Sequence, residues 1–149
     1  MSIGEDIHQK KFKSEFSKAL INLFYTNSWL EQKHQEIFKP SGLTTPQFNV
    51  LRILRGQYPN PATVNLLINR MIQKSSNASR IVDKLEDKAL VDRRQCKNDR
   101  RAVDVIISQK GLELLDVLDV KLDKLELNIK RLNDSEAEQL NVLLDKIRS

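Results

Sequence analysis

Residues 75–94 read SSNASRIVDKLEDKALVDRR, and this stretch decides the fold. Its first half predicts a short helix, because apolar residues recur there at helical spacing and form one face. These residues are Ala78, Ile81, Val82 and Leu85. Ser75 or Ser76 is expected to cap the helix, since a serine side chain there can accept a hydrogen bond from a free backbone N–H. The helix is therefore expected at about residues 76–88.

A second short amphipathic helix precedes this one. Its apolar face is predicted to consist of Val64, Leu67, Ile68 and Met71. The expected connection between the two helices is three or four residues long, from Ile72 to Lys74 or Ser75. Two short amphipathic helices on either side of a tight turn are the pattern of a helix-turn-helix.

The period of the sequence changes from helical to alternating after the second helix. Residues 91–95 and 102–107 are predicted to form two β-strands, the second with apolar residues at every other position. The residues between them are polar and mostly basic, as expected for an exposed hairpin tip. A hairpin placed directly after a helix-turn-helix makes the motif winged.

Helices are also predicted before this unit. Apolar residues recur at helical spacing over about residues 7–38, and the breaker sequence at residues 40–42 ends the run. A further helix is expected to begin at Thr44. Thr44 and Gln47 have the spacing of a capping box, and Pro46 fits the first helical turn.

The C-terminal part is predicted to be helical as well. Ser108 is expected to cap a long helix over about residues 110–132, whose apolar residues alternate by three and four as in a coiled-coil seam. Residues 133–135 end it, and a last helix follows. The outer helices carry more apolar residues than one small lobe can cover, which predicts a homodimer. These residues are Phe12, Phe16, Leu20, Leu23, Leu140, Leu144 and Ile147.

We therefore expect a single domain that is mainly α with a small β-hairpin wing. The length of 149 residues suits one domain, and an apolar share of 40% is enough for a core. A winged helix-turn-helix lobe is expected at about residues 44–108. It would lie between dimerisation helices at about residues 7–38 and 110–149.

The net charge of +5 lies entirely in the centre of the chain. Between Arg70 and Lys110 there are eleven Lys and Arg residues against six Asp and Glu residues, whereas the remainder carries fourteen of each. A local basic excess on a neutral body is typical of a surface that binds a polyanion such as nucleic acid.

The outward residues of the helix at about 76–88 are small or basic and fit the major groove of DNA. Small polar side chains at its N-terminal end let a helix enter the groove, while Asn and Arg side chains can pair with base edges. The backbone N–H groups at that end favour phosphate. The candidate DNA contacts here are Ser75, Ser76, Asn77, Ser79, Arg80 and Lys84.

The hairpin supplies a second set of candidate DNA contacts. Arginine is attracted to the negative potential of the narrow minor groove, where a protruding basic tip fits. Asp99 either orients a neighbouring arginine through a charge-assisted hydrogen bond or simply forms a turn with Asn98. The candidate contacts are Arg93, Arg94, Lys97, Asp99, Arg100 and Arg101.

Three segments of the chain together resemble the MarR family of winged-helix transcription regulators. They are LTTPQFNVLRIL at residues 43–54, SSNASRIVDKLEDKALVDRR at 75–94 and NDRRAVDVIISQKG at 98–111. Asp99 and Arg101 are similar to the two named positions of the family's D-x-R wing signature. The order of the segments and the long outer helices extend the resemblance over the whole chain.

The resemblance implies a transcriptional repressor that binds a pseudo-palindromic operator on double-stranded DNA as a homodimer. The second helix of the motif would enter the major groove, and the wing arginine would reach the minor groove. A small aromatic or phenolic effector, bound between the dimerisation helices and the DNA-binding lobe, would release the DNA.

The sequence departs from the family pattern at three positions. Ala89 stands where the family usually has a glycine, so we expect a less sharp end of the recognition helix. Ile72 and Ile68 replace a usual glycine and a usual alanine, so we expect a changed crossing of the two motif helices.

An enzyme is not expected. The two histidines, His8 and His34, belong to no grouping of nucleophilic or metal-binding type, and no glycine-rich phosphate loop is present. We therefore expect no catalytic residue, no metal and no cofactor. No apolar run has the length of a signal peptide or a membrane span, so a cytoplasmic protein without membrane contact is expected.

Two alternatives remain open. A helical dimeric interaction module or anti-repressor without specific DNA binding would use the same outer helices, although the basic hairpin argues against it. Cys96 lies among Arg93, Arg94 and Lys97, whose charges favour a reactive thiolate. It is either a redox sensor or an incidental exposed thiol.

Overall fold

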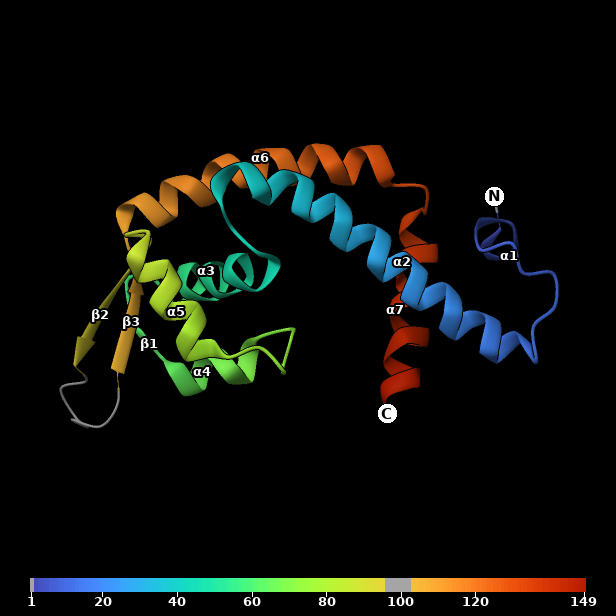
Figure 1. The fold of residues 1–149 in the computed structure, drawn as a ribbon, viewed down its shortest axis with the longest axis horizontal. Coiled ribbons are helices and arrows are strands. Elements are labelled where there is room, and N and C mark those ends of the chain that lie inside the picture. Colours follow the sequence, from blue (N-terminus) through green and yellow to red (C-terminus); the bar gives the residue numbers. More distant parts are fainter. Residues whose placement is uncertain (1, 96–102) are drawn as a thin grey trace.

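The computed structural model describes residues 2–95 and 103–149, which are mostly helical with one small antiparallel sheet. The elements in chain order are α1 (Ile3–Asp6), α2 (Glu15–Phe38), η1 (Lys39–Ser41), α3 (Thr45–Gln57), β1 (Ala62–Thr63), α4 (Val64–Arg70), α5 (Ala78–Asp87), β2 (Val91–Gln95), β3 (Val103–Ile107), α6 (Gln109–Ile129) and α7 (Asp134–Arg148). Figure 1 shows α6 along the top of the molecule and α2 in contact with it near the centre, from where α2 slopes towards the lower right. A lobe of α3, α4, α5 and the sheet lies beneath one end, and α7 lies at the other.

The N-terminal helix is shorter than predicted. The sequence predicted it from about Ile7, but α2 begins at Glu15 and the one-turn helix α1 precedes it. The Ser14 side chain accepts a hydrogen bond from the Ser17 N–H at 3.0 Å and so caps α2. The apolar period alone did not reveal this start, because a serine cap interrupts the helix without interrupting the period. The predicted end is confirmed: η1 follows α2, and Gly42 then takes a left-handed φ of 64°.

The predicted start of α3 is confirmed in detail. The Thr44 Oγ1 accepts from the Gln47 N–H at 3.4 Å, and the Gln47 Oε1 accepts from the Thr44 N–H at 3.1 Å. This reciprocal pair is a capping box, with Pro46 in the first turn. It fixes where the lobe departs from α2.

The helix-turn-helix is present, but its turn is longer than predicted. Residues 71–77 separate α4 from α5, in place of an expected three or four. The cap of α5 is Asn77 rather than Ser75 or Ser76, because the Asn77 Oδ1 accepts from the Arg80 N–H at 3.0 Å. The recognition helix therefore begins at Ala78, two residues later than expected.

The predicted hairpin is confirmed by the pairing of β2 with β3. Val91 lies opposite Ile107, and Gln95 lies opposite Val103. A third strand, β1, pairs with the other edge of β3 and gives the order β1-β3-β2. Strand β1 was not predicted from the sequence, since two residues are too few to show an alternating period. The hairpin tip at residues 96–102 lies outside the described residues.

One apolar core joins the lobe to the long helices. The end of α2 and the first half of α6 contribute to it together with α3, α4 and α5. Its largest fully buried side chains are Phe38, Leu51, Leu54, Leu67, Met71, Leu85, Leu115 and Leu118. Helix α5 is thus packed against the same core as α6.

The end of α5 is sharp, contrary to the expectation from Ala89. The Leu90 N–H donates to the Leu85 carbonyl at 2.9 Å, and the Ala89 N–H donates to the Glu86 carbonyl at 2.7 Å. These two bonds form a Schellman motif, which needs a left-handed residue at position 89. Ala89 takes that conformation with a φ of 57°, at a cost of about 1–2 kcal/mol for an L-residue.

The first turn of α6 satisfies the carbonyls that α5 leaves free. The Ser108 Oγ donates to the Ala89 carbonyl at 2.8 Å, and the Lys110 Nζ donates to the Lys88 carbonyl at 2.8 Å. The Ser108 N–H donates to the Leu90 carbonyl at 3.0 Å. A Cβ at Gly111 would lie 2.4 Å from the same Leu90 carbonyl oxygen. We call residues 85–90 and 108–111 the α5–α6 corner.

Gly111→Ala is expected to destabilise the protein by about 2–3 kcal/mol, because the new methyl group overlaps a backbone atom that cannot move alone. Gly56→Ala is the matched control. Its Cβ meets nothing within 4 Å, so helix propensity should raise stability by up to about 1 kcal/mol. Urea unfolding at equal protein concentrations measures both. Equal stability of Gly111→Ala and the wild type would contradict the corner geometry.

Candidate nucleic-acid interface

Helix α5 has an apolar inner face and a polar outer face. Ala78, Val82 and Leu85 are buried against the lobe. The outer face exposes Ser79, Arg80 and Lys84, as predicted. No carboxylate among the described residues lies within salt-bridge distance of Arg80, and its side chain extends from the first turn of the helix.

The predicted contact residues just before α5 lie in the turn and at the cap of the helix. The Asn77 oxygen is held in the helix cap, so only its amide NH2 group is left to donate to a base or phosphate. Ser75 and Ser76 lie in the turn, and the Ser76 Oγ bonds to the Gln73 Oε1 at 3.4 Å. These residues line the N-terminal entrance of the recognition helix.

Arg93 points back to the recognition helix. Its guanidinium pairs with Asp83, and its Nε lies 3.2 Å from the Glu86 Oε2. Its Nη2 also donates to the Ser79 carbonyl at 3.4 Å. Arg93 therefore ties β2 to α5, a link that the sequence analysis missed. Asp83 and Glu86, three residues apart on one face of α5, were the sequence feature that could have indicated a basic partner there.

The remaining hairpin residues divide into two groups. Arg94, the next residue of β2, is exposed. Lys97, Asp99, Arg100 and Arg101, like Cys96, lie outside the described residues. The structure thus places the base of the wing beside α5.

The turn before α5 is hydrogen-bonded to α3 and to α2. The Ile72 N–H donates to the Asn49 Oδ1 at 3.0 Å, and the Gln73 Nε2 donates to the Glu31 Oε1 at 3.3 Å. Ile72 is 82% exposed and Ile68 is 43% exposed. Neither side chain is enclosed between the two motif helices, so the expected effect of these residues on the helix crossing has no basis in the packing.

A groove of about 620 Å³ lies behind this turn, between the lobe and the long helices. Phe48, Asn49 and Arg52 of α3 form one wall, and apolar residues of α6 such as Leu122 form another. His34 of α2 and Ile72 of the turn also line it. The groove is mainly apolar, with a few polar groups at its walls.

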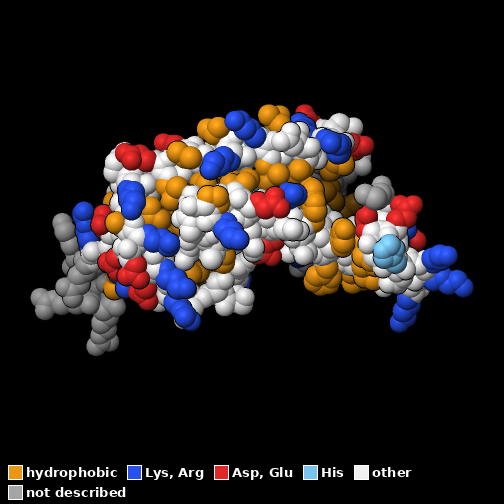
Figure 2. Space-filling view, turned by 45° about the horizontal axis from the view of Figure 1, so that its top comes forward, with side chains coloured by type: hydrophobic (Ala, Val, Ile, Leu, Met, Phe, Trp, Pro, Cys, Tyr) orange, Lys and Arg blue, Asp and Glu red, His pale blue; other side chains and the backbone are white. Residues whose placement is uncertain are grey.

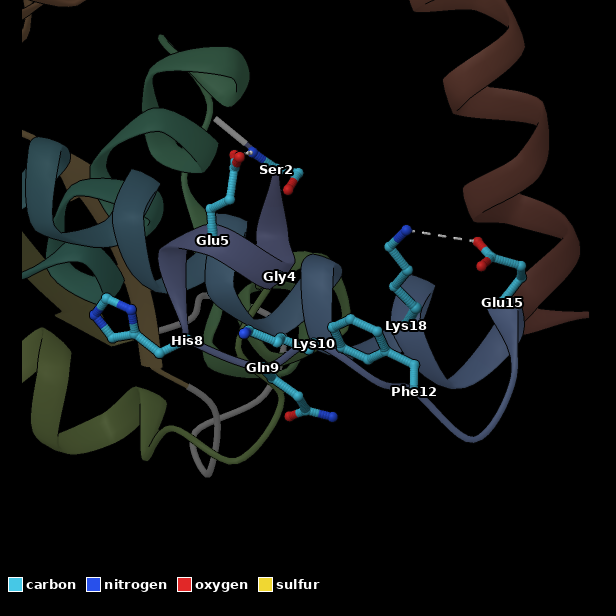
Figure 3. A pocket seen from close by; sticks show the side chains of 9 residues that line it. All are labelled: Ser2, Gly4, Glu5, His8, Gln9, Lys10, Phe12, Glu15 and Lys18. Atoms are coloured by element: carbon cyan, nitrogen blue, oxygen red, sulfur yellow. Dashed lines mark hydrogen bonds and ion pairs between the residues drawn. The ribbon is translucent and has the colours of Figure 1, made fainter.

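A second hollow of about 570 Å³ lies at the opposite end of the molecule, around the first residues of the chain. Figure 3 shows its lining side chains spread around α1 and the start of α2, with the Lys18 Nζ 3.8 Å from the Glu15 carboxylate. Over residues 2–95 and 103–149, no three His, Cys, Asp or Glu side chains are grouped so as to hold a metal ion. None of the described helices is both long enough and apolar enough to span a membrane.

A large apolar surface lies away from the lobe. Figure 2 shows hydrophobic side chains gathered on its right-hand half, the half that holds α7 and the start of α2 in Figure 1. Helix α7 buries none of its residues. The exposed apolar residues of α2, α6 and α7 include Phe16, Leu23, Phe24, Leu127, Leu140, Val142, Leu143 and Ile147.

The sequence and the fold match one family of known proteins. The model of the MarR family matches residues 43–103. The transcriptional repressor MprA of Escherichia coli is 28% identical over 126 residues, which are 84% of this chain and 72% of that protein. The regulator MgrA of Staphylococcus aureus is 27% identical over 127 residues, 85% of this chain and 79% of that protein.

A solved structure extends the match to the whole fold. The crystal structure of a MarR transcription factor from Planctomyces limnophilus has a TM-score of 0.69 and 27% identity, covering 93% of this chain and 98% of that one. These relatives are named as regulators of transcription. Residues 43–103 thus match the MarR family, and the chain is similar over most of its length to regulators of transcription.

Proposed function

We propose that the protein is a repressor that binds a pseudo-palindromic operator as a homodimer, with α5 of each protomer in the major groove. The observation that carries this proposal is the exposed outer face of α5, with Ser79, Arg80 and Lys84 on a helix that the α5–α6 corner holds rigidly. A helix with small and basic outward residues fits the groove. The name of the relative MprA, a transcriptional repressor, supports repression as the outcome.

The candidate contacts divide by the part of the DNA that they would reach. Arg80 is proposed to read base edges, since a guanidinium can form two hydrogen bonds with guanine. Phosphate contacts are proposed for Ser75, Ser76, Asn77, Lys84 and Arg94. The minor groove is proposed for Lys97, Arg100 and Arg101, with Asp99 orienting an arginine.

The homodimer is supported by α7, which buries none of its residues in the single chain. An isolated helix of the length of α7 is marginal in water, so burial of its apolar face is needed to hold it. Val142 and Leu143 are 62% and 58% exposed in the single chain. A second copy, related by a two-fold axis, would cover this face together with the exposed parts of α2 and α6.

The groove behind the turn is the proposed effector site. Its volume lies within the usual range for small-ligand pockets, about 300–1,000 Å³. Phe48 and Leu122 offer apolar contact, and His34 and Arg52 offer polar partners, which suits a small aromatic or phenolic molecule. Ile72 belongs both to the groove and to the turn that leads into α5. An effector that displaces Ile72 would move the start of the recognition helix.

Selection of bound sequences from a random duplex pool is expected to yield two inverted half-sites about one helical turn apart. On that duplex, Arg80→Ala should weaken binding by about 1–3 kcal/mol and relax the preference at one or two base pairs. Arg80→Lys keeps the charge but not the planar fork, so it should lose the base preference and keep the salt dependence. Fluorescence anisotropy on selected and shuffled duplexes gives both quantities.

The control for this experiment is Arg131→Ala. Arg131 lies in the connection between α6 and α7, and its guanidinium bonds only to nearby backbone carbonyls among the described residues. Its removal should leave the Kd unchanged. A pool that yields no preferred sequence, or an Arg80→Ala variant that binds like the wild type, would favour a protein-interaction module instead.

Asp83→Asn tests whether Arg93 holds the hairpin against α5. The variant removes a partner of Arg93 and also a negative charge beside the DNA surface. Loss of the link should weaken operator binding by about 0.5–1 kcal/mol, as expected for a partly exposed ion pair. Loss of the charge alone should tighten it. Asp87→Asn, on the same helix, removes a charge without touching Arg93 and is the control. Tighter binding by both variants would show that the link does not matter.

A further inference from the structure

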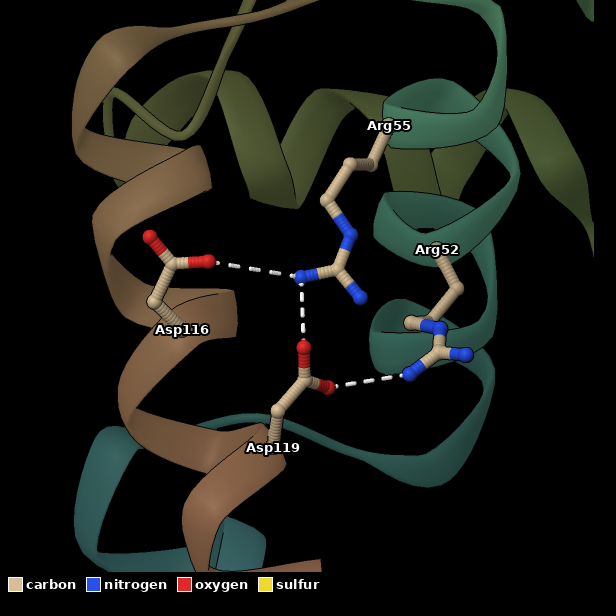
Figure 4. Close-up of polar contacts among 4 residues, drawn as sticks. All are labelled: Arg52, Arg55, Asp116 and Asp119. Carbon is tan, nitrogen blue, oxygen red and sulfur yellow. Dashed lines mark hydrogen bonds and ion pairs between the residues drawn. The ribbon is translucent and has the colours of Figure 1, made fainter.

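Four charged side chains connect α3 to α6 (Figure 4). The Asp119 Oδ1 accepts a hydrogen bond from the Arg52 Nη1 at 2.9 Å, and its Oδ2 accepts one from the Arg55 Nη1 at 2.7 Å. The Arg55 Nη1 also lies 3.6 Å from the Asp116 Oδ1. One carboxylate therefore holds two arginines, each through a different oxygen. We call Arg52, Arg55, Asp116 and Asp119 the α3–α6 clasp.

The clasp joins the DNA-binding lobe to a helix that extends beyond it. Helix α3 is packed into the lobe through Val50, Leu51 and Leu54. Helix α6 runs from the lobe towards the apolar end of the molecule (Figure 1). Any rotation of α3 on α6 would therefore turn the lobe, and α5 with it, relative to the proposed dimer.

The geometry of the clasp restrains this rotation. Arg52 and Arg55 lie one turn apart on α3, and Asp116 and Asp119 lie one turn apart on α6. Apolar contacts between the helices are non-directional, whereas charge-assisted hydrogen bonds have preferred lengths and angles. Contacts spaced along both helices resist turning as well as sliding.

The exposure of the clasp argues that its main contribution is not to folding. The side chain of Arg52 is 48% exposed and that of Asp119 is 30% exposed. Ion pairs with this degree of exposure add little to the stability of a fold. Removal of the carboxylate should thus change the orientation of the lobe more than the thermal stability.

We infer that Asp119 is a positioning residue for operator recognition, which fixes the lobe on α6 and thereby selects the spacing between the two half-sites. The inference rests on the proposed dimeric, two-site binding. Moving one half-site by two base pairs rotates it by about 70° around the duplex. A dimer with rigidly held lobes discriminates against that rotation, and a dimer with loosened lobes tolerates it.

The test compares Asp119→Asn with Asp123→Asn, which removes the same charge from an exposed position of α6 just beyond the clasp. Kd values are measured on duplexes that carry the selected half-sites at the selected spacing and at spacings two base pairs shorter and longer. Asp119→Asn is expected to lower the ratio of mis-spaced to matched Kd by about fivefold, the lower end of the usual range for coupling between sites. Asp123→Asn should leave the ratio unchanged, and Asp119→Glu, which keeps the carboxylate, should restore part of it.

Two further measurements separate this role from a merely structural one. Affinity for a duplex with a single half-site and the dimer mass in sedimentation should be unchanged in Asp119→Asn. Arg55→Gln breaks the other side of the clasp and should lower the ratio in the same direction, which keeps the test valid if Asp119→Asn folds poorly. A spacing ratio that stays at the wild-type value in these variants overturns the inference alone. A wild-type chain that is monomeric or binds no duplex overturns the proposed function as well.

Discussion

The backbone carbonyl of Leu90 meets the first turn of α6 so closely that position 111 has no room for a side chain. The same carbonyl accepts the Ser108 N–H, while Ser108 and Lys110 take up the two carbonyls before it. Three elements diverge from this corner: the recognition helix α5, the hairpin, and the long helix α6. Because short backbone contacts fix their starting directions, the corner sets where α5 and the hairpin leave α6, and the α3–α6 clasp holds the lobe further along that helix.

Directional polar contacts set the angles between the elements that the apolar core packs together. The buried leucines decide which elements are neighbours, but they do not by themselves set angles. Arg93 ties the hairpin to α5 through Asp83 and Glu86, and the clasp around Asp119 ties α3 to α6. Each link joins parts that must keep a fixed geometry if a dimer is to meet two successive major grooves. None is deeply buried, so their effect falls on orientation more than on folding stability.

Much of the fold could be predicted from the sequence, because helical and alternating periods distinguish helices from strands and capping residues mark several ends. Thr44, Ser108 and Asn133 cap helices where the pattern predicted a boundary. The start of α2 at Glu15, the seven-residue turn and strand β1 could not be predicted, since local caps and tertiary pairing decide them. In the site, the outward face of α5 was predicted, but the pairing of Arg93 with α5 depends on how β2 packs. The clasp joins residues far apart in the chain, and no local pattern reveals it.

Hydroxyl-radical footprinting of the wild-type protein on its selected duplex shows whether two copies present α5 symmetrically to DNA. Two protected tracts are expected on each strand, related by a two-fold axis and about one helical turn apart. Protection should weaken steeply with salt, by about 10³–10⁵ in affinity between 50 and 200 mM if roughly 6–10 phosphates are contacted. A single unsymmetrical tract, or binding that salt does not weaken, would contradict the proposed binding mode.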